Sequence, residues 1–206
     1  MNCRVKICGI TNLEDALHAC EQGADALGFV FYKKSPRYIE PEKANEIVKQ
    51  LPPFVVPVAL FVNAEYELIH SVIEKNDRWV IQFHGDESNA ECQKYNRTFI
   101  KALRVKPDDN INLEIKSYPD ASAILLDAYK AGVPGGTGES FNWELVPKNT
   151  NKSIILAGGL TVSNIRQAVE QVQPYAVDVS GGVELSKGIK DHNKVQQFIT
   201  GAKRGQ

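Results

Sequence analysis

The two side chains with the clearest chemical potential are a thiol and a carboxyl group, each at the end of a predicted strand. Cys8 ends the first strand candidate and Asp127 ends the sixth. Held on separate sides of a substrate, such groups can act as general base and general acid. An isolated cysteine has a pKa of about 8.5, so Cys8 needs electropositive surroundings, to which Lys6 can contribute. The ordinary alternatives are a small buried hydrophobe at Cys8 and a loop cap at Asp127.

Glycine-rich turns follow the last two strand candidates. Gly158 and Gly159 come after the seventh, and Ser180, Gly181 and Gly182 come after the eighth. Exposed backbone N–H groups in two neighbouring loops, together with a short extra helix, can stabilise a phosphate, and glycine lets the backbone approach the anion closely. A single pair of this kind equally fits a tight turn. Two pairs on consecutive strands favour a phosphate site.

Three further residues have both a functional and a structural interpretation. Arg37, in the loop after the second strand, can clamp a carboxylate with two hydrogen bonds or simply belong to a solvated basic turn. His84, at the end of the fourth strand, can bind substrate or cap its loop, and the pattern favours neither. Asp178 has the strand parity to face the barrel interior beside Lys6, where the two predict a structural ion pair.

Residues 133–138, Val-Pro-Gly-Gly-Thr-Gly, form a glycine-rich segment after the sixth strand. No Gly-Lys-Ser/Thr follows, so this is not a nucleotide-binding P-loop. Glycine hinges suit a lid that closes over a substrate, which is the interpretation we favour over an ordinary surface loop.

Eight short β-branched or aromatic runs must position these groups, and helix-period patterns separate them. The strand candidates are residues 4–8, 26–31, 55–62, 79–83, 98–104, 123–126, 153–157 and 176–179. Strict alternation implies parallel strands, and short units without a Gly-x-Gly-x-x-Gly after the first strand favour a closed barrel over an open sheet. Helix-start residues follow the strand ends at Thr11 or Asn12, at Ser88 or Asn89, and within residues 161–164. The sequence therefore predicts an α/β fold, a (β/α)8 barrel, as a single domain over residues 1–206, with the site at its C-terminal mouth.

Composition narrows the functional classes. The chain has 206 residues and a formal charge of -1, which offers no broad cationic surface for nucleic acid or anionic lipid. The longest apolar run, residues 54–62, is too short to cross a bilayer, and the N-terminus lacks the apolar stretch of a signal peptide. The four cysteines form neither a CxxC nor a disulfide-rich arrangement. We therefore expect a cytoplasmic protein with reduced thiols and a small anionic substrate.

Taken together, these motifs resemble the phosphoribosylanthranilate isomerase family of tryptophan biosynthesis along the whole chain. The resemblance is carried by residues 6–11, 35–39, 82–85, 126–127, 135–138, 157–160, 177–180 and 188–191, with Phe141 and Trp143. Each motif is weak alone, but their order and spacing are specific. Two positions depart from the family pattern, because Gly181-Gly182 follows Ser180 and Lys187 replaces a common proline. The first departure leaves the individual phosphate donors open.

The resemblance implies an Amadori rearrangement of N-(5-phosphoribosyl)anthranilate to 1-(2-carboxyphenylamino)-1-deoxyribulose 5-phosphate without metal or cofactor. It implies that Asp127 is the general acid that opens the ribose ring and that Cys8 is the base that removes the C2 proton. Arg37 would hold the anthranilate carboxylate, and the loops after strands seven and eight would bind the phosphate. A monomer and a homodimer are both compatible with the sequence.

Two rivals remain at this stage. The histidine-pathway phosphoribosyl isomerase performs the same rearrangement on a bulkier substrate, but its family uses aspartate as the base on the first strand, where this chain has Cys8. A non-catalytic barrel that binds phosphate or flavin is the second alternative, and a yellow purified protein would favour it.

Overall fold

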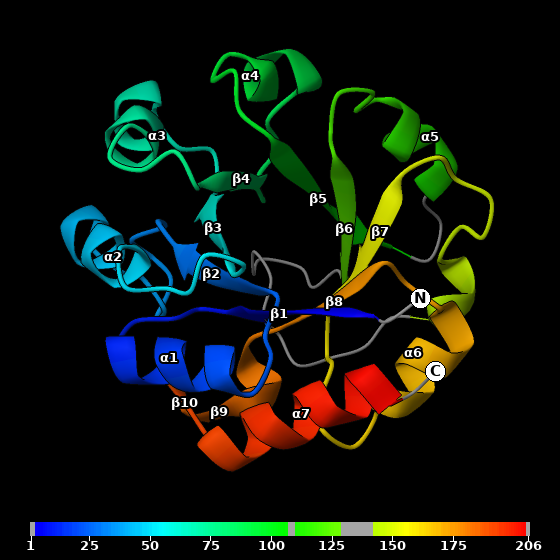
Figure 1. Cartoon of the computed structure of the whole chain (residues 1–206). Helices are drawn as coiled ribbons and strands as arrows, with labels where there is room; N and C mark the ends of the chain where they lie inside the picture. Colours follow the sequence, from blue (N-terminus) through cyan, green and yellow to red (C-terminus); the bar gives the residue numbers. More distant parts are fainter. Residues whose placement is uncertain (1–2, 107–109, 129–141, 205–206) are drawn as a thin grey trace.

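Eight parallel strands close into a barrel in the computed structural model of the chain, which describes residues 3–106, 110–128 and 142–204 (Figure 1). Each strand pairs with the next in sequence, and β8 closes the barrel by pairing with β1. The strands are β1 Arg4–Cys8, β2 Ala26–Val30, β3 Val56–Phe61, β4 Val80–Phe83, β5 Phe99–Val105, β6 Ala123–Ala128, β7 Ser153–Leu156 and β8 Ala176–Val179. All eight predicted strands are thus confirmed, and their ends differ from the predicted ones by at most two residues.

Helices surround the barrel as an outer ring (Figure 1). They are α1 Leu13–Glu21, α2 Pro41–Val48, α3 Tyr66–Ile73, α4 Asn89–Gln93, α5 Ile111–Lys116, α6 Ile165–Val172 and α7 His192–Arg204. Two predicted start signals act as caps, because the Asn12 side chain accepts a bond from Asp15 N and Ser88 forms a capping box with Glu91. Each helix therefore begins shortly after a strand ends, which leaves the βα loops at one mouth of the barrel.

The connection between β6 and β7 departs from the predicted alternation. Its described part holds a single 3-10 turn, Trp143–Leu145, where the pattern predicts an α-helix. Pro147 follows closely, and a proline disfavours helical conformation in the residue before it. Residues 129–141, which include the predicted lid, lie outside the described residues.

The barrel interior changes character along its length. Small and branched apolar side chains fill its N-terminal and middle part, namely Ala26, Val58, Val80, Ile100, Ala102, Ala123, Leu125, Ile155 and Ala176, and Ala157 joins the same cluster from just past the C-terminal end of β7. The same inward-facing positions become polar further along β4, β6 and β8, at His84, Asp127 and Asp178. The N-terminal half therefore provides a packed floor, while the C-terminal half presents functional groups.

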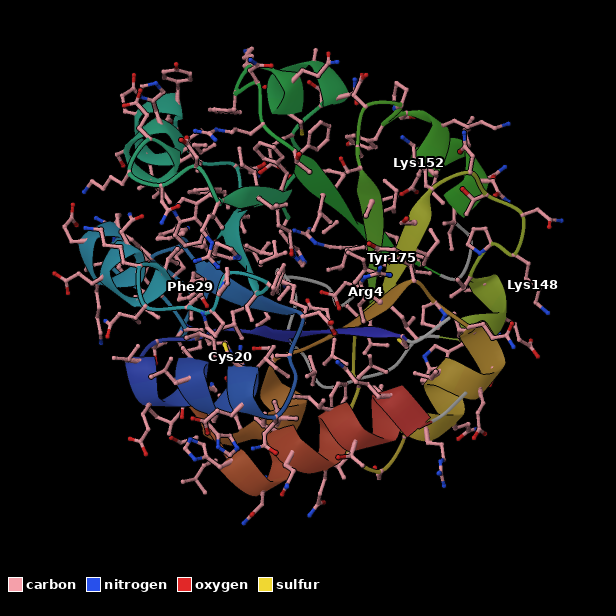
Figure 2. The ribbon with its side chains drawn as sticks, in the orientation of Figure 1. Arg4, Cys20, Phe29, Lys148, Lys152 and Tyr175 are labelled. Carbon is pink, nitrogen blue, oxygen red and sulfur yellow. The ribbon has the colours of Figure 1, made fainter. Side chains whose placement is uncertain are left out.

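Alternate strand positions point outward and form the larger core beneath the helices. Its aromatic centre joins Phe29, labelled in Figure 2, to Trp79 in an edge-to-face contact with ring centroids 5.4 Å apart. The buried indole Nε1 of Trp79 donates to Asn45 Oδ1 of α2 at 3.0 Å. At the opposite end of the barrel from the mouth, the guanidinium of Arg4 covers the Tyr175 ring, 4.5 Å from its centroid (Figure 2).

A short excursion separates β8 from α7. It consists of a 3-10 turn, η2 Gly181–Val183, followed by a small antiparallel pair, β9 Glu184–Ser186 and β10 Ile189–Lys190. This η2 turn is the short extra helix expected beside a phosphate site. In the described part of the chain, no helix is both long and apolar enough to cross a membrane.

The outward face of β6 provides a test of the packing. Leu126 is completely buried between sheet and helices, so Leu126→Ala should lower the free energy of unfolding by about 2–5 kcal/mol. Leu113 is 64% exposed on α5, and the matched change Leu113→Ala should cost under about 0.5 kcal/mol. Denaturant unfolding followed by circular dichroism measures both. Equal costs would contradict this assignment of the core.

Candidate active site

The C-terminal ends of the strands surround a pocket of about 640 Å³, a volume typical of small-molecule sites. All nine residues singled out in the sequence as catalytic or substrate-binding line it. A second hollow, between α6 and α7, is smaller and more open. The fold thus brings the predicted thiol, carboxyl, cation and glycine loops together at one mouth.

Cys8 sits deep in the pocket wall at the end of β1, with 5% of its surface exposed. Beneath it, Lys6 Nζ donates to Asp178 Oδ1 at 2.9 Å, which confirms the predicted ion pair. Burial raises the pKa of the Cys8 thiol above its ordinary value, although the Lys6 and Lys190 charges act in the opposite direction. The predicted electropositive surroundings are therefore present, but burial has the larger effect on the pKa of the thiol.

Gly28 on β2 provides the space that Cys8 occupies. A Cβ atom at this position would lie 2.7 Å from Cys8 Sγ and 3.0 Å from Lys6 Cε. Cys8 Sγ and Lys6 Cε thus both lie against the backbone of Gly28, and the thiol and the lysine side chain are neighbours. A glycine at residue 28 is thus required by a close approach.

Asp127 points inward from β6 and is hydrogen-bonded through both oxygens. Its Oδ1 accepts from Ala128 N at 2.9 Å, and its Oδ2 lies 3.2 Å from His84 Nε2. Gln82 Nε2 donates to His84 Nδ1 at 3.0 Å, which assigns the proton of a neutral His84 to the nitrogen facing Asp127. The chain Gln82–His84–Asp127 therefore aligns the carboxyl group.

The His84 ring makes contacts that neither of its two sequence-based interpretations named, with Gln82 on one side and Asp127 on the other. Its ring lines the pocket, yet both ring nitrogens are already engaged by protein groups. The Arg104 guanidinium, from β5, holds the His84 backbone by donating from Nη2 to the carbonyl at 3.1 Å. The nearest acidic partner of the His84 ring is therefore the Asp127 carboxyl group.

The two glycine loops pack against each other at the mouth. Gly158 and Gly159 have φ angles of 79° and 63°, in the region that favours glycine. A Cβ at Gly182 would collide with the carbonyl oxygen of Leu160, so the loops touch backbone to backbone. Asn164 fastens the first loop by donating to Gly159 O at 2.9 Å and accepting from Thr161 N at 2.8 Å.

Several polar groups in these loops are without protein partners. The Ser180 hydroxyl is buried and makes no hydrogen bond within the described residues. Gly159, Gly181 and Gly182 are partly or fully exposed, and among the described residues their backbone N–H groups have no hydrogen-bond acceptor. Convergent unpaired donors at a short helix start are the requirement for an anion site.

The opposite wall is apolar. Val30 and Leu60 pack beside Cys8, with Tyr32 and Val62 against them. A ligand that carries an anion at one end and a flat apolar ring at the other fits this division of the pocket.

Arg37 crosses the mouth from the loop after β2 and meets a carboxylate of the protein itself. Its Nε and Nη2 atoms donate to the two oxygens of Glu184 at 2.7 and 2.8 Å. Hydrogen bonds from Arg37 and the charge of Lys190 hold the pKa of Glu184 below its usual value despite burial. One edge of the Arg37 guanidinium thus already binds a carboxylate through two hydrogen bonds, and that carboxylate is Glu184 of the same chain.

Four residues of the site were missed in the sequence. Gln82 and Arg104 stand at inward-facing strand positions, so the parity argument that was applied to Lys6 and Asp178 could have found them. Glu184 and Lys190 had no such signal, because they lie in the short antiparallel pair β9 and β10, which the sequence pattern did not predict.

Comparisons with known proteins agree with this geometry. The sequence model of the family described as N-(5'phosphoribosyl)anthranilate (PRA) isomerase matches residues 5–201. The N-(5'-phosphoribosyl)anthranilate isomerase of Marinomonas sp. (strain MWYL1) is 66% identical over 205 residues, which cover 100% of both chains.

Solved structures give the same result. Phosphoribosyl anthranilate isomerase from Thermotoga maritima superimposes with a TM-score of 0.89 at 44% identity, over 98% of each chain. A structure of this isomerase in complex with reduced 1-(o-carboxyphenylamino)-1-deoxyribulose 5-phosphate has a TM-score of 0.86 at 43% identity, again over 98% of each chain. With the barrel, the pocket and full-length matches in agreement, the chain belongs to the N-(5'-phosphoribosyl)anthranilate isomerase family.

Proposed function

We propose that the chain converts N-(5'-phosphoribosyl)anthranilate to 1-(2-carboxyphenylamino)-1-deoxyribulose 5-phosphate in tryptophan biosynthesis, with Cys8 as general base and Asp127 as general acid. One observation carries the assignment of roles. The thiol of β1 and the carboxyl group of β6 line one pocket whose far wall consists of two glycine loops with unpaired donors. A phosphorylated ribose can reach all three.

Each of the two groups carries out one proton transfer of the reaction. Protonated Asp127 gives its proton to the ribose ring oxygen, the C1–O bond breaks, and the anthranilate nitrogen forms a protonated imine at C1. The Cys8 thiolate then removes the proton from C2, and the electron pair forms the C1–C2 double bond of an enolamine. Tautomerisation of the enol gives the ketone. The sequence of steps is an internal redox exchange between C1 and C2, so it needs no external oxidant.

Pocket chemistry supports one orientation of the substrate. The loops containing Gly158, Gly159, Ser180, Gly181 and Gly182 bind the phosphate through backbone donors and the Ser180 hydroxyl. The anthranilate ring lies along the apolar wall around Val30 and Leu60. Its carboxylate meets the edge of Arg37 that Glu184 leaves open.

His84 acts as a positioning residue in this proposal. Its Nε2 contact at 3.2 Å keeps Asp127 Oδ2 in one orientation, and Gln82 in turn fixes the ring. Such support is required because a general acid must lie within hydrogen-bond reach of the atom it protonates.

Cys8 weighs against the histidine-pathway isomerase. The full-length family match weighs against a non-catalytic flavin barrel. Consumption of phosphoribosylanthranilate, generated in situ and followed by the decay of anthranilate fluorescence, tests substrate and reaction together. A yellow protein that leaves the fluorescence unchanged would refute the proposal.

The same proposal extends to the setting of the enzyme. All four cysteines are unpaired, which supports a cytoplasmic role in aromatic amino acid biosynthesis. We expect residues 1–206 to act as one domain. A solved relative described as monomers generated from a dimeric isomerase shows both states in that protein, and either state, monomer or homodimer, remains our expectation for this chain.

Removing either proton-transfer group should lower turnover without unfolding the protein. Cys8→Ser and Asp127→Asn keep nearly the same volume, and each should reduce kcat by at least about a hundredfold. The fluorescence assay measures kcat, while circular dichroism confirms the fold. Near-normal turnover in either variant would remove the role assigned to that residue.

Removing the cation should affect binding more than chemistry. Arg37→Ala eliminates a carboxylate contact that exists in both ground and transition states, so KM should rise while kcat changes less. Initial rates over a range of substrate concentrations separate the two parameters. An unchanged KM would contradict the carboxylate contact.

Crowding the thiol should also impair catalysis. Gly28→Ala places a methyl group 2.7 Å from the present position of Cys8 Sγ, so we expect kcat to fall roughly tenfold to a hundredfold. Gly23→Ala is the control, since its positive φ of 94° makes the change costly to stability at a position outside the pocket. A larger loss of turnover at residue 23 than at residue 28 would contradict the proposed crowding.

A further inference from the structure

Arg37 presents two edges on which a carboxylate can bind with two hydrogen bonds. The side-on edge consists of Nε and one Nη, and the end-on edge consists of the two Nη atoms. Glu184 occupies the side-on edge through bonds of 2.7 Å to Nε and 2.8 Å to Nη2. Among the described residues, nothing bonds to Nη1, so the end-on edge is the one left for a ligand.

Glu184 is itself held in place by other donors. Its Oε1 accepts from Lys190 Nζ at 3.1 Å and from Gly188 N at 3.2 Å, besides Arg37 Nε. Both acidic and basic partners are buried, with side-chain exposures of 6% for Glu184 and 0% for Lys190. A carboxylate with four donors inside the protein has little freedom to rotate.

Two glycines prevent Arg37 from adopting another course. A Cβ at Gly9 would lie 2.6 Å from Arg37 Cδ, and a Cβ at Gly181 would lie 3.1 Å from Nη2. The arginine therefore runs closely past the backbone of the loops after β1 and β8. Its direction is determined by contacts along the whole side chain.

From this geometry we infer that Glu184, supported by Lys190, is a positioning residue that turns the end-on edge of Arg37 toward the substrate carboxylate and so confers selectivity for a carboxylated aromatic amine. The inference rests on the proposed function, because it assumes that Arg37 binds that carboxylate. Two cations, Arg37 and Lys190, surround one anion, Glu184, so the group has a net charge of one positive unit. One substrate carboxylate would neutralise this charge. The lowered pKa of Glu184 favours its ionised form at this position.

Electrostatics and positioning predict opposite effects of removing Glu184 on the binding of a carboxylate. Without this anion the local charge becomes more positive, so a carboxylate should bind more tightly. Positioning predicts weaker binding, because the guanidinium loses its fixed orientation and two-bond geometry. The two explanations thus differ in sign.

The experiment compares two ligands with several variants. The first ligand is reduced 1-(o-carboxyphenylamino)-1-deoxyribulose 5-phosphate, and the second is its counterpart without the ring carboxylate. Calorimetric titration gives the Kd of each ligand. The Kd of the ligand without the carboxylate, divided by the Kd of the carboxylated ligand, measures recognition of the carboxylate alone. We expect Glu184→Gln to lower the ratio by roughly tenfold by weakening the carboxylated ligand alone.

Controls make the result specific. Glu42→Gln removes the acid of an exposed Glu–Lys pair on α2 and should leave the ratio as in the parent protein. If Glu184→Gln does not fold with two buried cations unpaired, the double variant Glu184→Gln with Lys190→Met removes one charge of each sign and carries the same expectation.

The outcomes separate the two levels of the argument. If Arg37→Ala leaves the ratio unchanged, the carboxylate contact in the proposed function is wrong. If Arg37→Ala abolishes the preference but the Glu184 variants keep it, or bind the carboxylated ligand more tightly, only the positioning role is overturned. A loss in both supports it.

Discussion

The ion pair between Lys6 and Asp178 joins the first strand to the last inside the barrel, and the site depends on it. The two residues are paired in the β1–β8 register, with 2.9 Å between Nζ and Oδ1. Charges removed from water are tolerated only with a partner, so neither side chain can turn away. Their attraction raises the pKa of Lys6 although burial opposes its charge. A fixed cation therefore lies next to Cys8, while the same pair seals the barrel where its closing strands meet.

The side chains inside the barrel change from apolar to polar along the strand direction. Apolar side chains occupy the lower interior positions, where only packing matters. The upper positions carry the thiol and carboxyl groups to which we assign proton transfer, and each has at least one neighbour that restricts it. Gly28 shapes the space of Cys8, while His84 and Ala128 N hold Asp127. Stability of the floor and precision at the mouth thus come from the same eight strands.

Loops that are distant in sequence are tied together across the mouth by charge. Arg37 follows β2 and Glu184 follows β8, yet they form a two-bond contact 147 residues apart. Lys101 on β5 does the same for the loop after β4, because it donates to Gly85 O at 2.7 Å and to Glu87 at 2.8 Å. These cross-links hold pocket-lining segments to the rigid barrel. Preorganised groups of this kind need little rearrangement when a charged ligand binds.

Much of this protein could be derived from the sequence by itself. Alternating periodicities predicted eight strands and the closed barrel, and strand ends and paired glycines selected Cys8, Asp127 and two glycine loops, which the structure brings together in one pocket. These succeed because backbone geometry makes them local: a strand alternates every second residue, and a loop that approaches an anion needs glycine. Among the described residues, the connection before β7 departs from the pattern, because it holds a 3-10 turn, followed by Pro147, where a helix was expected.

Only the tertiary structure decided what each side chain touches. The sequence left His84 between substrate and loop, and the fold places its ring against Asp127. It pointed Arg37 at a substrate carboxylate, whereas the fold gives one edge of Arg37 to Glu184. Burial of Cys8, with its effect on the pKa of the thiol, was equally invisible. The physical reason is common to all three: pairing and desolvation depend on groups from distant strands, and no local pattern encodes the angle and distance at which they meet.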